Sequence, residues 1–135
     1  MIESAEEFVQ LRSSADPAEY ARAAHEEASL QVWLQVIERY PEMRPRVAQN
    51  KRVPVEILEL LSRDEDERVR WFVASKRRLP ERIQLRLAFI ESESVQRRLV
   101  VNAKATEAVL EALSRDRDPY IREKARERLE GGTSV

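Results

Sequence analysis

The sequence predicts an all-α fold, a short right-handed α-solenoid of stacked helical repeats with a 26-residue period. Similar residues recur every 26 positions along the middle and C-terminal parts of the chain. The only two glycines, Gly131 and Gly132, lie at the end, and no run alternates apolar and polar residues as a half-buried strand does. A period of this length indicates supersecondary units that cannot bury their apolar faces alone and therefore stack.

Five sets of equivalent positions define the repeat, and we call each 26-residue segment a copy. Four sets are apolar and the fifth marks a helix start: Met43, Val69, Val95 and Ile121; Val47, Val73, Leu99 and Ala125; Ile57, Ile83 and Val109; Leu61, Leu87 and Leu113; and Pro54, Pro80 and Thr106. The regular apolar positions are the expected core of the stack, and each copy is expected to hold two helices.

Capping residues mark the helix starts of the N-terminal part. Ser4 opens a Ser-x-x-Glu capping box, which predicts a helix from there to about Arg12. Asp16, followed by proline, is the expected N-cap of a second helix. Ser29 can cap a third helix, in which Trp33 is expected to be buried.

In the later copies the second helix is expected to follow an N-cap residue at equivalent positions: Asp66, Ser92 and Asp118. The length of 135 residues fits one small domain. Within it we expect an N-terminal helical cap with a degenerate first repeat over 1–43 and helical repeat units over 44–130. Residues 131–135 are expected to be a flexible tail that begins with a Gly-Gly helix stop.

One string of the second copy carries a family resemblance: Pro54-x-x-x-Leu58-x-x-Leu61-x-x-Asp64-x-Asp66-x-x-Val69-Arg70-x-x-Val73-Ala74. It resembles the leucine-rich repeat variant, a relative of the HEAT and armadillo helical repeats, and the match covers roughly residues 41–129. The resemblance implies an interaction scaffold whose ligand differs from protein to protein. The best-known protein of this kind holds an iron–sulfur cluster through cysteines, but this chain has no cysteine, so we expect no cofactor.

Two polar sets vary together. An acidic position reads Glu38, Asp64, Ile90 and Asp116, and the position six residues later reads Arg44, Arg70, Gln96 and Arg122. Where the acid is missing, the arginine is missing too, which favours an ion pair or cap within each copy over a row of ligand-binding cations. A third set, Asn50, Lys76 and Asn102, is expected at helix C-termini, where asparagine can adopt left-handed geometry.

Charge is unevenly distributed along the chain, whose formal net charge is −1. Residues 1–43 carry a net charge of −6, residues 44–104 carry +6, and the remainder carries −1. The basic side chains of the expected interhelix loops would form a stripe if the copies stack: Lys51, Arg52, Lys76, Arg77, Arg78 and Lys104. Such a stripe can contact phosphates or an acidic protein surface, or it is simply a solvated rim.

Aromatic residues occur in the middle copy at positions where other copies carry charge. Trp71 is equivalent to Arg97, and Phe72 is equivalent to Arg46 and Arg98. Because charged equivalents indicate solvent access, the two rings with these three arginines form a candidate partner-binding surface. The alternative is that the rings cover an edge of the helix stack.

The sequence offers little for catalysis. His25 is the only histidine and lies in an acidic segment, with no nucleophile or metal-ligand motif at a recognisable spacing. We therefore expect no enzyme and no metal. We expect instead a protein–protein interaction scaffold, adaptor or inhibitor; the alternative is a nucleic-acid-binding HEAT-like protein.

The residues also bear on where the protein works. The first residues, 1–11, are acidic where a secretion signal would be basic and then apolar, and no stretch is apolar enough to span a membrane. We therefore expect a cytoplasmic protein without membrane contact. The sequence leaves the partner and the oligomeric state open.

Overall fold

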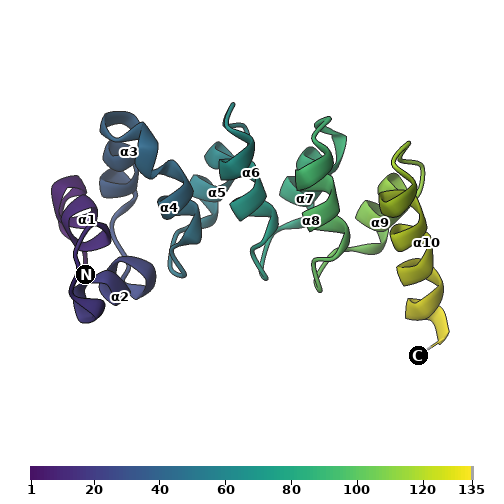
Figure 1. Ribbon diagram of the computed structural model, residues 1–135, viewed down its shortest axis with the longest axis horizontal. Helices are drawn as coiled ribbons and strands as arrows, with labels where there is room; N and C mark the ends of the chain where they lie inside the picture. Colours follow the sequence, from purple (N-terminus) through teal and green to yellow (C-terminus); the bar gives the residue numbers. More distant parts are fainter. Residues whose placement is uncertain (135) are drawn as a thin grey trace. The chain divides into compact units, whose positions relative to one another are not determined.

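The protein is all-α, as the sequence predicts. The computed structural model (Figure 1) describes residues 1–134, with side chains through residue 131. These residues contain no strand, only one isolated parallel bridge between Ile2 and Ala28. The helices are α1 (Ala5–Arg12), α2 (Pro17–His25), α3 (Leu30–Arg39), the 3₁₀ helix η1 (Pro41–Met43), α4 (Arg44–Gln49), α5 (Val55–Leu61), α6 (Glu67–Ala74), α7 (Glu81–Phe89), α8 (Glu93–Val100), α9 (Glu107–Leu113) and α10 (Pro119–Ser134).

The chain forms two compact units, Met1–Arg63 and Asp64–Val135. The first unit contains α1 to α5, with α1 packed on α2 and α3, and α3 packed on α4 and α5. Its centre holds Phe8 and Trp33, which are fully buried and meet edge to face with ring centroids 5.1 Å apart. The expected burial of Trp33 is confirmed. The predicted division into a 1–43 cap and 44–130 repeats follows the sequence copies and stays a prediction.

The second unit has two rows of helices. In Figure 1, α6, α8 and α10 follow one another, and α8 contacts both of the others. The second row consists of α7 and α9, which pack on each other and on α8. The buried side chains between the rows include equivalent members of the apolar sets: Val69, Val95 and Ile121, and Leu87 and Leu113.

Most expected N-caps are present. The side-chain oxygens of five cap residues accept a main-chain N–H from the first turn of their helix: Ser4, Asp16, Ser29, Asp66 and Asp118. α8 begins directly after Ser92, as expected, but the Ser92 side chain makes no cap hydrogen bond. Its hydroxyl instead donates to a carboxylate oxygen of Glu67 at 2.6 Å and so connects α8 to α6.

Three residues at equivalent positions, two just after a helix end and one within α10, bond to main-chain carbonyls of the preceding copy. No described non-glycine residue has a positive φ, so the expected left-handed asparagine is wrong. We call the observed contacts carbonyl bridges: Asn50 Nδ2 to Ala23 O (2.8 Å) and Glu26 O (2.9 Å), Asn102 Nδ2 to Ala74 O (2.8 Å) and Lys76 O (2.9 Å), and Arg128 Nη1 to Val100 O (2.8 Å) and Asn102 O (2.7 Å). They satisfy carbonyls that a helix end leaves without an intrahelical donor.

The last helix is longer than expected. α10 continues through Gly131 to Ser134, so the expected helix stop at the glycine pair is wrong for the described residues. Val135, the last residue of the expected tail, lies outside them.

Candidate functional site

Two aromatic side chains of α6 form the first candidate site. Trp71 is 36% exposed and Phe72 is half-buried. Their ring centroids lie 5.3 Å apart, and the ring planes are perpendicular. This edge-to-face contact holds the indole in one orientation at the surface, as expected for a preorganised aromatic anchor.

Arg98 of α8 completes this group. Its guanidinium carbon lies 5.4 Å from the centroid of the Trp71 ring, within the range of a cation–π contact. Its Nε donates to Ser75 Oγ at 3.0 Å, and that hydroxyl donates to the Trp71 carbonyl oxygen at 2.9 Å. The arginine is therefore fixed beside the ring by two contacts. We call Trp71, Phe72 and Arg98 the aromatic site.

Arg97 belongs to a different cluster. Its guanidinium nitrogens lie 3.0 and 3.2 Å from Asp118 Oδ2 and 3.0 Å from Glu93 Oε1, and the group lies over the Tyr120 ring at 4.9 Å. The bond to Asp118 raises the pKa of Arg97. Burial raises the pKa of Asp118, but the bonds from Arg97 and from the Tyr120 amide outweigh it, so that pKa lies below its usual value.

The remaining predicted partner-binding arginine lies in the other compact unit. Arg46 is half-buried on α4, and its Nη1 donates to Gln49 Oε1 at 3.2 Å. That Arg46 flanks the aromatic rings stays a prediction. The structure brings together three of the five predicted residues.

The predicted basic stripe lies in loops between helices. Lys51 and Arg52 are exposed between α4 and α5 in the first unit. In the second unit the loop after α6 holds exposed Arg77 and Arg78 with half-buried Lys76, and the loop after α8 holds exposed Lys104. Their alignment into one stripe stays a prediction.

The covarying arginines bond to main-chain carbonyls of the acidic positions, in the turn between two helices. Arg70 Nη1 donates to the carbonyl oxygen of Asp64 at 2.6 Å, and Arg122 Nη1 reaches that of Asp116 at 3.4 Å. In the copy that lacks the acid, Gln96 Nε2 donates to Ala88 O at 2.9 Å. These contacts support a structural role for the arginine position over ligand binding, because each bond ends on a main-chain carbonyl of the chain itself.

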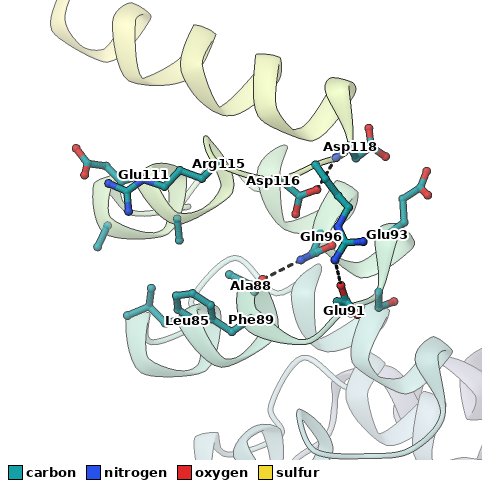
Figure 2. Close-up of a pocket in the computed structure, with 14 residues that line it drawn as sticks. Leu85, Ala88, Phe89, Glu91, Glu93, Gln96, Glu111, Arg115, Asp116 and Asp118 are labelled. Atoms are coloured by element: carbon teal, nitrogen blue, oxygen red, sulfur yellow. Dashed lines mark hydrogen bonds and ion pairs between the residues drawn. The ribbon is translucent and has the colours of Figure 1, made fainter.

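The sequence interpretation missed a second candidate site, a groove between α7 and α9. It has a volume of about 780 Å³, and its apolar lining includes Leu85 and Phe89 of α7 with Ala108 and Ala112 of α9. Figure 2 shows Leu85 and Phe89 on one wall and α9 on the other. Phe89 is 75% exposed, the most exposed large apolar side chain among the described residues. We call these four residues the apolar groove.

Charged residues surround the apolar groove. Arg117 Nη2 lies 2.7 Å from Glu91 Oε1, and both residues belong to the lining. The ionisable lining residues are five acids and two arginines, which gives the lining a formal charge of −3: Glu91, Glu93, Glu111, Asp116, Asp118, Arg115 and Arg117. The groove therefore has apolar walls and an acidic rim.

A signal for this groove was present in the repeat. The segment 61–64 reads Leu-Ser-Arg-Asp, and so does the equivalent segment 113–116. The segment between them, 87–90, reads Leu-Ala-Phe-Ile, so three polar residues are replaced by apolar ones at one turn. Of these replacements, only Ile90 falls in the covarying acidic and arginine sets.

Other kinds of site find no support among the described residues. Within residues 1–134, no three His, Cys, Asp or Glu side chains are placed to hold a metal ion. His25 is exposed at the end of α2. No helix in the described part of the chain is both long and apolar enough to cross a membrane.

Comparison of the chain with protein-family models, curated proteins and solved structures gives no significant match. The resemblance to the leucine-rich repeat variant therefore stays a prediction, and the function is inferred from the chain's own residues.

Proposed function

We propose that the chain is a non-catalytic protein–protein interaction module, a cytoplasmic adaptor or inhibitor built of HEAT-like repeats stacked as a right-handed α-solenoid. The observation that carries this proposal is the aromatic site. Trp71 is exposed yet held by Phe72 and Arg98, and tryptophan and arginine are the residues most enriched in interaction hot spots.

The solenoid part of the proposal is supported by contacts that recur at equivalent positions. Asp66 and Asp118 cap α6 and α10 in the same way, through the amide two residues later at 2.8 Å. The carbonyl bridges of Asn102 and Arg128 each reach one copy back. Nearest-neighbour contacts of this kind are what a stack of repeats requires.

The rigid placement of the aromatic site favours binding over a purely structural role. A fixed side chain loses little conformational freedom when it enters a partner, so more of its burial contributes to affinity. A ring that merely covered an edge of the stack would not need a cation over its face. We expect the indole of Trp71 to enter a partner pocket, with Arg98 at its margin.

Affinity capture from native lysate, with and without nuclease, tests this proposal. The wild-type chain is compared with Trp71→Ala, and Tyr20→Ala is the matched control. Tyr20 is also exposed, with the Arg12 guanidinium 4.4 Å from its ring, but it lies in the first unit. We expect a nuclease-resistant partner that Trp71→Ala loses and Tyr20→Ala keeps. A partner retained by both variants would contradict the role of the aromatic site.

A specific observation favours nucleic-acid binding as the second candidate function. Arg77, Arg78 and Lys104 are exposed in equivalent interhelix loops of one compact unit, where they can meet phosphates. Binding to a labelled duplex should then fall steeply between low and moderate salt. The triple change of these residues to glutamine should flatten that dependence, and a salt-independent signal would contradict this alternative.

A further inference from the structure

Both walls of the groove between α7 and α9 carry apolar residues at positions where the other copies carry charged residues. Leu85 of α7 is equivalent to Glu59 and Glu111, and Phe89 is equivalent to Arg63 and Arg115. On α9, Ala108 is equivalent to Glu56 and Arg82. The helices that carry these positions contact each other, so the substitutions combine into one exposed apolar surface.

Core formation does not explain these residues. The inward positions of the same helices are filled by other side chains, including Ile83, Leu87, Val109 and Leu113, which are all buried. Phe89, by contrast, leaves three quarters of its surface in water. An exposed apolar patch in a hollow, with polar residues around it, is typical of a binding groove.

The geometry of the walls defines the size of the occupant. Leu85 and Phe89 are four residues apart on one helix, and Ala108 and Ala112 are four apart on the other. Four helical residues span about 6 Å, so each wall offers one turn of apolar surface. The alanines leave room where longer side chains would fill the space between the helices. This room suits two apolar side chains that lie one turn apart on a partner helix.

The rim defines the charge of the occupant. The lining carries a net charge of −3, and Arg117, one of its two arginines, is paired with Glu91. Arg97, which is not part of the lining, bonds to Glu93 and Asp118. Glu111 and Asp116 are the remaining acids of the rim. A segment with lysine or arginine beside its apolar residues would complement this rim, and an acidic segment would be repelled.

We infer that the apolar groove binds a short amphipathic basic helix of a partner protein, with two apolar side chains between Leu85, Phe89, Ala108 and Ala112 and with lysine or arginine against the acidic rim. The inference rests on the proposed function as an interaction module, but it concerns a different surface from the aromatic site.

Selection from a displayed library of random peptides of roughly 16 residues, about four helical turns, tests the inference without a known partner. We expect the wild-type chain to enrich peptides with apolar residues three or four apart and with flanking lysine or arginine. Binding of a synthesised, labelled winner should weaken about tenfold or more in Leu85→Glu/Phe89→Arg. The same peptide with its basic residues changed to glutamate should not bind.

The double variant is a conservative probe, because it installs the residues found at the equivalent positions of other copies. Circular dichroism and thermal melting should therefore match the wild-type protein. Trp71→Ala separates the two proposals: it should lose the lysate partner while keeping the selected peptide. Failure of the lysate experiment with retained peptide binding would contradict only the aromatic site.

Three results would overturn the inference. They are enrichment of acidic peptides, peptide binding that is unchanged in Leu85→Glu/Phe89→Arg, and a concentration-dependent dimer in sedimentation that this variant abolishes. The last result would assign the groove to a second copy of the chain.

Discussion

The turn after α9 and the turn after α7 occupy equivalent positions of the repeat and use different chemistry. After α9, Ser114 Oγ donates to the Glu111 carbonyl oxygen at 2.6 Å, and Asp116 Oδ1 accepts the Asp118 amide at 2.9 Å. This turn caps itself. After α7 the serine and aspartate are absent, the helix continues to Phe89, and the helix-end carbonyl of Ala88 is satisfied by Gln96 from α8.

The difference shows that a helix end can be stabilised by residues of its own turn or by a side chain of another helix. The same self-capped pattern follows α5, where Ser62 Oγ reaches the Glu59 carbonyl oxygen at 2.6 Å and Asp64 Oδ1 accepts the Asp66 amide at 2.9 Å. The turn after α7 has replaced these contacts with exposed apolar surface. The two turns share a buried leucine at their start and differ in the contacts that cap the preceding helix. We expect substitutions at these two places to have different effects on stability.

The largest loss of stability should come from the buried leucines that the two turns share. Leu87 and Leu113 begin the two segments and are both buried. Leu87→Ala and Leu113→Ala should each lower the free energy of unfolding by about 3 kcal/mol, because each removes a core side chain and leaves a cavity. Urea denaturation followed by circular dichroism measures this. A much smaller loss at Leu87 would show that the α7 end is loosely packed.

The next effect should distinguish the two turns. Gln96→Leu should lower the free energy of unfolding by about 2 kcal/mol, because it leaves the buried Ala88 carbonyl without its hydrogen-bond donor. Arg122→Leu is the matched change after α9 and should lower the free energy of unfolding by less than about 1 kcal/mol. Arg122 Nη1 lies 3.4 Å from the Asp116 carbonyl oxygen, and the turn is also held by the bond from the Asp118 amide to Asp116 Oδ1. Equal losses in urea denaturation would contradict the comparison.

A smaller effect is expected when the α7 turn is converted to the regular one. The triple change Ala88→Ser/Phe89→Arg/Ile90→Asp restores the Ser-Arg-Asp segment. It should change the free energy of unfolding by less than about 1 kcal/mol, because new caps offset the lost packing of half-buried Ile90. NMR chemical shifts should show α7 ending near Leu87. A helix that still continues to residue 89 would contradict the capping explanation.

The smallest effect concerns pH. Because folding lowers the pKa of Asp118, its carboxylate stabilises the fold fully above its unfolded pKa of about 3.9. That contribution is lost as the pH falls through the lower, folded value. Asp118→Asn keeps a capping side chain without the titration, so stability measured from pH 5 to pH 2 (roughly the carboxylate range) should decline less steeply than in the wild-type protein. Parallel pH curves would contradict this.

The sequence was sufficient for the all-α class and for most helix starts, because both depend on local chemistry. Capping by Ser4, Asp66 and Asp118 needs only a side-chain oxygen and the amides that follow it. The hydrogen bond of Ser92 could not be predicted in the same way, because its hydroxyl can bond either to a local amide or to the Glu67 carboxylate of another helix. Only the packing of the helices determines which of these partners the side chain takes.

The candidate sites were less predictable. Equivalent charged positions indicated the exposure of Trp71. Only the packing of α6 on α8 shows that Arg98 reaches the ring, and only the packing of α8 on α10 shows that Arg97 bonds to Asp118. The groove required two helices to be placed side by side, because neither Leu85 nor Ala112 alone suggests a hollow. The repeat nevertheless held the clue in the segment 87–90.

The carbonyl bridges have a consequence for how such a chain can change length. Asn102 bonds to the copy before it, and its own carbonyl accepts from Arg128 of the copy after it. A duplicate of the segment 90–115, inserted in register, would thus bring both the donor and the acceptor that its neighbours require, because it carries Asn102. Gene duplication could lengthen the protein one copy at a time without a new interface. A chain extended in this way is expected to melt cooperatively and no lower than the parent.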